Sequence, residues 1–171
     1  MTVKITKPEI NVREKLNELD FAKLPFQKMP AGSVVQYQSA STGQSIATSS
    51  TSYVDTGVDI VFTPKFANSK VLITVQSRRF NLVTADVMNV KIVRDDSTDV
   101  LGIQNTEPNM HFQNNNSTAA NQIAMGLHYM WEDTLSSLNE IKYSVYFNVN
   151  AGTGYLSDTG GVQLYIQEIA Q

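Results

Sequence analysis

From residue 33 onward, short runs in which apolar and polar residues alternate are separated by polar or glycine-containing turns. Alternation places successive side chains on opposite faces of a β-strand and is typical of a strand buried on one side. In the run Lys70–Arg79, for example, Val71, Ile73 and Val75 share one face. The pattern predicts strands at 33–39, 53–63 (interrupted at Gly57), 70–79, 87–94, 100–104, 123–131, 141–149 and 162–169. Many short strands separated by turns indicate an all-β sandwich or jelly roll.

Two stretches leave alternatives open. Residues 41–52 are rich in Ser and Thr, and they fit either a loop or an extended edge strand. Ala119–Met130 is compatible with a helix by propensity alone. The Tyr, His and Trp residues that follow Ile123 favour a strand beginning at that residue, because aromatic side chains are enriched in strands.

The first 32 residues differ from the rest and contain the one good helix signal. Thr6 and Glu9 form a capping box, and Pro8 falls in the first turn, where its missing N–H costs little. Pro25 cannot continue the helix. The result is a helix of about 12–17 residues, which is marginal on its own in water.

The apolar face of this predicted helix is narrow. Val12, Leu16 and Leu19 follow helical spacing, and Phe26 comes seven residues after Leu19, as in a short coiled-coil seam. The helix either packs on its own domain or joins the chain to copies and other proteins. The Pro-rich connector that follows also has to bury Phe26 and Met29. We therefore expect residues 1–32 to be an attachment and oligomerisation segment and residues 33–171 to be the β-sandwich domain, with attachment through Val12, Leu16, Leu19, Phe26 and Met29.

Composition narrows the class of protein. A chain of 171 residues allows one domain with an appendage. Only 17% of its residues are charged, against a usual value of about 25%, and Ser, Thr, Asn and Gln take their place. Such a composition suits either a β-rich surface exposed to varied solvent or a surface that packs against further copies of the chain. The net charge of −3 without a basic patch argues against nucleic acid as a partner. The chain has no cysteine, no apolar run long enough for a membrane helix and no secretion signal, so we expect it to be made in a cytoplasm and not to enter a membrane.

Candidate chemistry is sparse, and we expect neither catalysis nor a cofactor. The chain has no Gly-x-Ser-x-Gly motif whose serine could use His111 or His128 as a general base. The spacing of the two histidines also does not match a zinc-binding pattern. The acidic turn Asp95–Asp99 is compatible with a cation, but it lacks the EF-hand spacing, and Asp and Ser are ordinary turn residues. We therefore predict no metal site, while occupancy of this turn stays open.

Two loops are candidate binding sites. Asn114, Asn115 and Asn116 offer hydrogen-bond donors and acceptors together, as a carbohydrate-facing loop does, although a solvated loop is the simpler interpretation. Tyr155 lies in a glycine-rich stretch between two predicted strands and is a candidate contact residue at a loop tip.

Several segments resemble virion structural proteins of tailed phages, particularly marine and cyanophage types with small tail-fibre or particle-surface domains. The leader-like segments are Ile5–Asp20 (ITKPEINVREKLNELD) and Leu24–Gln36 (LPFQKMPAGSVVQ). The body segments are Tyr53–Gly57 (YVDTG), Phe62–Ile73 (FTPKFANSKVLI) and Leu164–Ala170 (LYIQEIA). The resemblance implies a trimeric, tumour-necrosis-factor-like jelly roll in the virion, bound to other virion proteins through its leader, with no catalytic residues.

Within this expectation, several roles remain open. The chain has no shaft between leader and body, so a short fibre or fibre-associated protein, a head decoration and a tail collar or nozzle part all fit. A host-glycan-binding module is an alternative that shares the fold, whereas a glycan hydrolase would need a carboxylate pair that the sequence does not display. For the trimer, we expect contacts from aromatic residues on an outward face, namely Tyr129, Trp131, Tyr143 and Tyr165.

Overall fold

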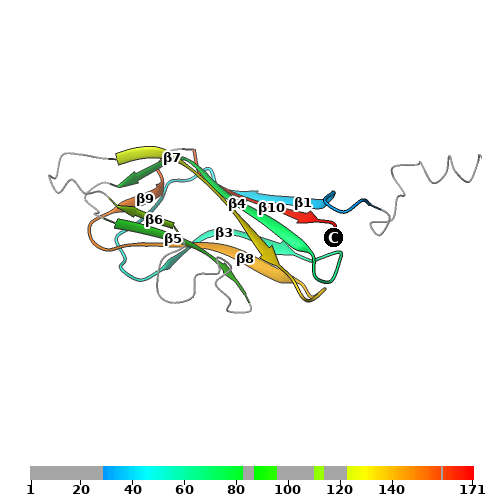
Figure 1. Ribbon diagram of the computed structural model, residues 1–171. Helices are drawn as coiled ribbons and strands as arrows, with labels where there is room; N and C mark the ends of the chain where they lie inside the picture. The colour runs from blue at the N-terminus through cyan, green and yellow to red at the C-terminus, as the bar shows by residue number, and fades with distance from the viewer. Residues whose placement is uncertain (1–28, 83–86, 96–109, 114–122, 159) are drawn as a thin grey trace, which may run out of the picture.

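The protein is described by a computed structural model, which covers residues 29–82, 87–95, 110–113, 123–158 and 160–171. This part of the chain is all-β and forms two antiparallel sheets that pack against each other (Figure 1). The expected all-β body is thus confirmed. No helix in the described residues is long and apolar enough to cross a membrane. The predicted helix after Thr6 and the predicted strand 100–104 lie outside the described residues.

The strands are short and follow one another along the whole described chain. Their bounds are β1 (Val34–Ser41), β2 (Ile46–Thr48), β3 (Val54–Phe62), β4 (Lys70–Leu82), β5 (Val87–Arg94), β6 (Met110–Gln113), β7 (Ile123–Thr134), β8 (Ile141–Val149), β9 (Gly154–Ser157) and β10 (Val162–Ile169).

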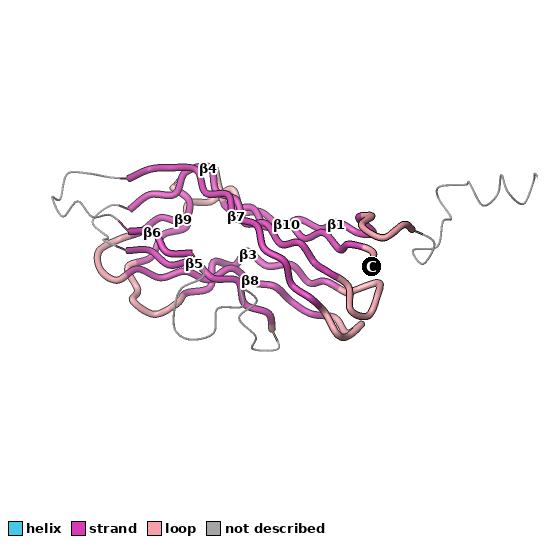
Figure 2. Tube along the Cα trace, viewed as in Figure 1, coloured by secondary structure: helices cyan, strands magenta, loops and turns pink. Residues whose placement is uncertain are grey.

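The two sheets differ in size. In the tube view, the labels of β4, β7, β10 and β1 lie above those of β5, β3 and β8 (Figure 2). The larger sheet has six strands: β1 pairs with β10, β10 pairs with β4, and β7 pairs with the other edge of β4. Beyond Ser77, where the pairing with β10 stops, β4 pairs with β9, and β9 in turn pairs with β2. The smaller sheet has the order β3-β8-β5-β6.

The core lies between the sheets and is built from alternate residues of the strands. Val71, Ile73 and Val75 of β4 are fully buried, as are their neighbours Leu164 and Ile166 on β10. They belong to one continuous cluster with the apolar residues of β3, β5 and β8. The face shared by Val71, Ile73 and Val75 in the sequence is therefore the core face, as the alternation predicts.

Some strands differ from the prediction. β7 runs from Ile123 to Thr134, which excludes the helical alternative for those residues. β2 occupies part of the Ser- and Thr-rich stretch, so an extended edge forms there. β2, β6 and β9 have only three or four residues each, too few for an alternating pattern to be recognised.

A buried carboxylate closes one end of the sandwich. Glu168 on β10 is fully buried, and its oxygens accept hydrogen bonds from the backbone N–H groups of Lys65 and Phe66 at 2.9–3.0 Å. The Nε2 atom of Gln36 on β1 donates a third bond to Glu168 at 2.6 Å and also bonds the carbonyl of Thr63 at 2.8 Å. The β3–β4 loop is thereby held against the edge of the larger sheet.

The two ends of the described domain lie together at this same end of the sandwich (Figure 1). The N–H of Gly32 donates to the carbonyl of Ala170, and the N–H of Ala170 donates to the carbonyl of Ser33, both at 2.8 Å. The chain therefore enters and leaves the sandwich at one end.

Candidate functional site

The outward-facing side of the β1-β10-β4-β7 strands, which we call the outer face, gathers residues in cross-strand rows. Directly paired residues of antiparallel strands point to the same side of a sheet. The register therefore defines three rows: Tyr37, Gln167, Leu72, Glu132; then Ser39, Tyr165, Thr74, Met130; then Ser41, Gln163, Gln76, His128.

The first two rows carry an apolar patch, formed by Tyr37, Leu72, Met130 and Tyr165. Tyr37 and Met130 are 54% and 55% exposed, and the rings of Tyr37 and Tyr165 stack with centroids 6.1 Å apart. Glu132 is the only formally charged residue described in these rows, and it pairs with Lys70 at 2.7 Å. The patch thus exposes large apolar side chains with little charge around them.

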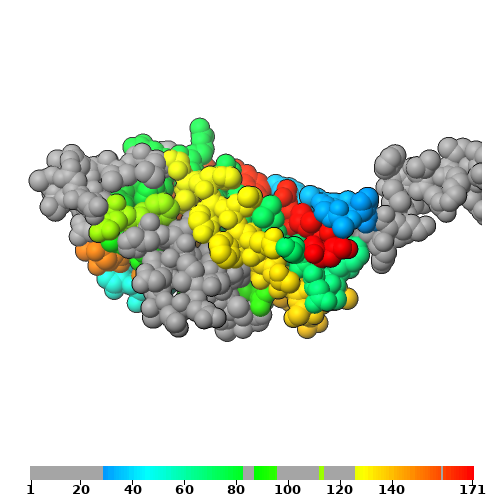
Figure 3. Space-filling model, viewed as in Figure 1, coloured from blue at the N-terminus to red at the C-terminus, as the bar shows by residue number. Residues whose placement is uncertain are grey.

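An apolar hollow adjoins the patch at the β7 edge of the outer face. It has a volume of about 310 Å³ and is lined by Leu72, Met130, Trp131 and Glu132. In the space-filling view, β7 (yellow) lies at the surface along much of its length (Figure 3). Tyr37 lies on β1, at the opposite edge of the face. The outer face therefore has an exposed aromatic ring at one edge and a hollow at the other.

The aromatic residues expected at a trimer interface occupy three different environments. Tyr165 lies on the outer face. Tyr129 and Trp131 are half-buried, pack against the core and stack on each other with centroids 6.5 Å apart. Tyr143 was expected on an outward face, and this is wrong: its side chain is fully buried between the sheets. Its spacing of two residues from Val145 places it on the core side of β8.

Tyr143 belongs to a polar bridge between the two sheets. Its hydroxyl donates to the Oδ2 atom of Asp133 on β7 at 2.8 Å, and Arg94 on β5 pairs with the same oxygen at 3.0 Å. Burial raises the pKa of the Tyr143 hydroxyl above its ordinary value, and the charge of Asp133 raises that pKa further. The phenol is thus held neutral, as a donor to a carboxylate that is already paired.

A β-bulge lies just beyond the third row. Arg78 and Arg79 of β4 lie opposite the single residue Gly126 of β7, between the pairs Ser77–Leu127 and Phe80–Met125. The neighbour of β4 also changes at this place: β4 pairs with β10 as far as Ser77 and with β9 from Asn81 onward. The bulge therefore marks the point where the larger sheet changes strand partners.

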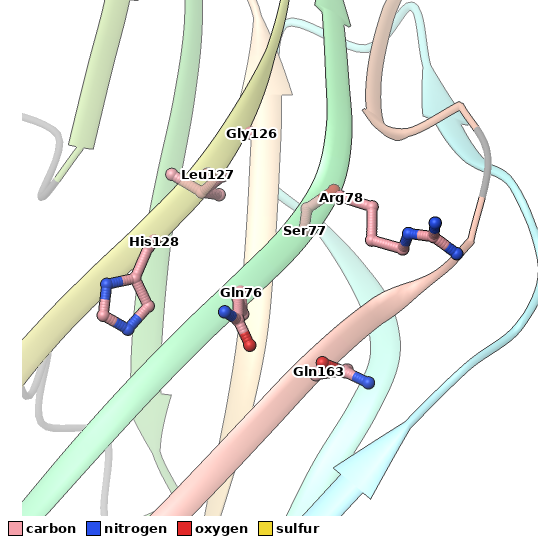
Figure 4. A pocket seen from close by; sticks show the side chains of 7 residues that line it. All are labelled: Gln76, Ser77, Arg78, Gly126, Leu127, His128 and Gln163. Atoms are coloured by element: carbon pink, nitrogen blue, oxygen red, sulfur yellow. The ribbon is translucent and has the colours of Figure 1, made fainter.

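A polar hollow of about 360 Å³ lies beside this bulge (Figure 4). Its lining residues are Gln76, Ser77, Arg78, Gly126, Leu127, His128 and Gln163. Figure 4 shows the side chains of Gln76, Arg78, His128 and Gln163 on the same side of β4, β7 and β10. Gly126 leaves space there, because an added Cβ would meet only backbone oxygens of Ser77 and Arg78, at 3.9 and 3.8 Å.

The polar groups of this hollow are largely without internal partners. The Tyr165 hydroxyl donates to Oε1 of Gln163 at 2.7 Å. The amide nitrogen of Gln163 has no hydrogen-bond partner among the described residues. Among the described residues, the side chains of Gln76, Arg78 and His128 have no hydrogen-bond or ion-pair partner. The adjacent Arg79 differs, because it pairs with Asp158 at 3.4 Å.

The other predicted site residues are only partly covered. Val12, Leu16, Leu19, Phe26, Asn114, Asn115 and Asn116 lie outside the described residues, and Met29 is half-buried. Tyr155 was expected at a loop tip but lies in β9, where it pairs with Ala47 and Asn81. Asp95 is exposed in its turn, and Asp96 and Asp99 are not described. In the described part, no three His, Asp or Glu side chains are placed to hold a metal ion.

Sequence reasoning missed the residues of the polar hollow. A signal was present: the adjacent charged residues Arg78 and Arg79 break the alternation of β4 before Phe80 returns to the core. Gly126 within an otherwise aromatic and apolar strand is a second such signal.

Comparison with known proteins supplies no relative: no family model matches the chain, and no curated protein matches it either. These comparisons therefore assign no function, partner or site residue to the chain. The outer face and the polar hollow are the two surface features from which a function can be argued.

Proposed function

We propose that this chain is a structural protein of a tailed-phage particle, a short fibre or fibre-associated protein that assembles as a homotrimer. The main observation in support of an oligomer is the charge-poor apolar patch on the outer face, where Tyr37 and Met130 are more than half exposed. The particle itself is proposed from the resemblance of residues 5–36 and of the body segments to virion proteins.

The composition of the outer face supports self-association. Interface cores are depleted in charge and enriched in aromatic residues and Met, which is the character of Tyr37, Tyr165 and Met130. Val34, which is 48% exposed and paired with Ile169, extends this apolar surface along β1. A second copy covering this surface would remove it from water.

The arrangement of the patch supports a closed ring of subunits rather than a two-fold dimer. A ring uses two different surfaces on each subunit, one for each neighbour. Tyr37 at the β1 edge and the apolar hollow beside Met130 at the β7 edge are two such surfaces. In the ring, the Tyr37 ring of one copy fills the hollow of the next, and the Glu132 carboxylate at its rim accepts the phenolic hydrogen. The number three is taken from the resemblance.

We propose further that the domain is a jelly roll of the tumour-necrosis-factor type. The strand orders β1-β10-β4-β7 and β3-β8-β5-β6 support this fold. Successive strands also alternate between the two sheets, from β3 to β4 to β5 and from β6 to β7 to β8, as they do in a jelly roll.

Anchoring to other virion proteins is assigned to residues 1–32. The backbone pairing of Gly32 and Ser33 with Ala170 supports this, because it fixes where the N-terminal segment joins the sandwich. The opposite end of the sandwich then points away from the anchor. A head decoration and a tail collar or nozzle part would use the same trimer, and electron microscopy of particles carrying a labelled copy distinguishes these positions.

The protein is proposed to be non-catalytic. The most buried carboxylates described, Glu168 and Asp133, are engaged by backbone amides and by Arg94 and Tyr143, which supports a structural role for each. Incubation of the protein with host polysaccharide, followed by analysis of chain length, would reveal turnover that contradicts this proposal.

The trimer is tested by light scattering of the full-length protein at several concentrations. The expected mass is three times 18.9 kDa. Met130→Lys should weaken association by about a hundredfold or more, because it places a charge at the centre of the interface. Leu138→Lys is the matched control, since Leu138 is 53% exposed in the β7–β8 loop, outside the strands of the outer face. A wild-type protein that is monomeric at every concentration would overturn the proposal.

A further inference from the structure

We propose that the polar hollow beside the β4 bulge binds one residue of an acidic saccharide, a sugar ring that carries a carboxylate. This inference goes beyond the structural role above and does not depend on the trimer. It is carried by the shape of the hollow, by the amide of Gln76, by the free amide nitrogen of Gln163 and by the guanidinium of Arg78, which has no partner among the described residues.

The size of the hollow suits a single sugar ring. Its volume of about 360 Å³ lies at the lower end of the range for ligand sites, which begins at about 300 Å³. The hollow exists because the bulge displaces Arg78 and because Gly126 contributes no side chain opposite it. It is open to solvent on the outer face, so a ring within a longer glycan chain can enter it (Figure 4).

The amides supply the groups that recognise sugar hydroxyls. Gln76 and Gln163 are directly paired neighbours on β4 and β10, so their side chains lie next to each other on one face. Each amide offers a donor and an acceptor, and a sugar hydroxyl needs both. The hydrogen bond from Tyr165 fixes the oxygen of Gln163 and leaves its nitrogen to donate to a ligand. His128, next in the row, adds an exposed imidazole.

The guanidinium selects an acidic sugar. Arg78 has no carboxylate partner among the described residues, whereas Arg79 beside it is paired with Asp158. A guanidinium presents two parallel N–H donors that match a carboxylate. Gly160 allows the Arg78 side chain to lie close to the β9–β10 connection, because a Cβ at this glycine would lie 2.7 Å from Cδ and 3.4 Å from Nε and Nη1 of Arg78. Arg78 is the one Arg or Lys among the described residues that line the hollow, so the hollow matches a singly charged carboxylate better than a doubly charged phosphate.

The hollow adjoins the apolar patch and extends beyond it. Gln163 and His128 lie two residues from the patch residues Tyr165 and Met130 on the same strands. Gln76 and Arg78, however, lie four and six residues from Leu72 along β4, which is roughly 13 and 20 Å in an extended strand. The hollow is also further from the anchored end of the domain than the patch, because β4 runs away from that end beyond Lys70 (Figure 1). Trimer formation through the patch and sugar binding in the hollow are thus compatible.

The test is an NMR titration of the full-length protein with D-glucuronic acid, with glucose and the methyl ester of glucuronic acid as uncharged counterparts. We expect the backbone amide signals of Gln76, Gly126 and Gln163 to shift with glucuronic acid. The affinity should be on the order of millimolar, as befits a small ligand in an open site. Glucose and the ester should bind at least tenfold more weakly. Equal binding of all three sugars, or no shifts at these amides, would overturn the inference.

Variants locate the site and separate charge from shape. Arg78→Gln should reduce the affinity for glucuronic acid at least tenfold, to the level of glucose, whereas Arg79→Gln should leave it unchanged. Gly126→Val should abolish binding of acid and neutral sugar alike, because its side chain fills the hollow, and circular dichroism checks that the fold is retained. An Arg78→Gln variant that binds like the wild type would refute the role of the guanidinium. Light scattering on the same samples separates the two proposals: a trimer that binds no sugar overturns this one alone.

Discussion

Replacement of the buried Glu168 by Gln tests the most specific polar interaction in the fold. The carboxylate receives hydrogen bonds from three donors: the Nε2 atom of Gln36 and the backbone N–H groups of Lys65 and Phe66. Gln has nearly the same size, but it lacks the charge, and one of its two polar ends is itself a donor. At least one of the three donors must therefore lose its acceptor, and the others exchange a charged acceptor for a neutral one.

The magnitude follows from these three bonds. A hydrogen bond to a charged group contributes about 1.5–3 kcal/mol and a neutral one about 0.5–1.5 kcal/mol, and a buried donor without a partner costs a further 1–3 kcal/mol. The lower cost of burying a neutral amide offsets part of this loss. We expect Glu168→Gln to lower the free energy of unfolding by about 3 kcal/mol, and the melting temperature by about 6–12 °C for a chain of this size.

The assay is urea denaturation at pH 7 and at one fixed protein concentration, because association shifts apparent stability. Glu140→Gln, at an exposed position in the β7–β8 loop, is the control and should change stability by less than about 0.5 kcal/mol. A Glu168→Gln variant whose stability matches that of the control would refute the reasoning that the carboxylate holds the β3–β4 loop.

Two further predictions concern the polar bridge and a close backbone contact. Because the pKa of Tyr143 is raised in the folded state, its contribution to stability is complete below about pH 10 and is lost as the pH rises further. Tyr143→Phe should remove a slope of about 1.4 kcal/mol per pH unit above pH 10, measured by urea denaturation at pH 9 and 11; equal slopes in wild type and variant would contradict this. Gly161→Ala should prevent folding, because the backbone has φ of +77° there and a Cβ would lie 1.4 Å from the carbonyl oxygen of Thr42. Gly43→Ala, with nothing within 4 Å of its Cβ, should fold normally by circular dichroism, and a soluble, cooperatively unfolding Gly161→Ala protein would contradict the reasoning.

Local pattern was sufficient for the long strands but not for the short ones. β4, β5, β8 and β10 were recognised because each alternates over eight or more residues. β2 and β9 have too few residues to show a period. β9 is held by hydrogen bonds to β4 on one side and to β2 on the other, and β2 is held by its pairing with β9. That pairing joins residues about a hundred positions apart, which no local pattern encodes.

Side-chain direction was partly available from the sequence. Tyr143, two and four residues before Val145 and Phe147, shares their face, and that spacing placed it in the core. Tyr165 alternates with Leu164 and Ile166, which placed it outside. The error for Tyr143 came from treating aromatic residues as a group without counting their positions along the strand.

The sequence by itself determined the all-β class, the core faces of the long strands and the charge-poor surface, because these depend on residue type and on the two-residue period of a strand. Only the tertiary structure decided which strands are neighbours, and hence that Tyr37, Tyr165, Leu72 and Met130 form one patch. The tertiary structure alone also decided where the neighbour of β4 changes from β10 to β9, and the polar hollow around Arg78 and Gly126 lies at that place. The physical reason is that strand pairing and the bulge depend on hydrogen bonds between distant segments, whereas the alternating pattern records only which side of each strand avoids water.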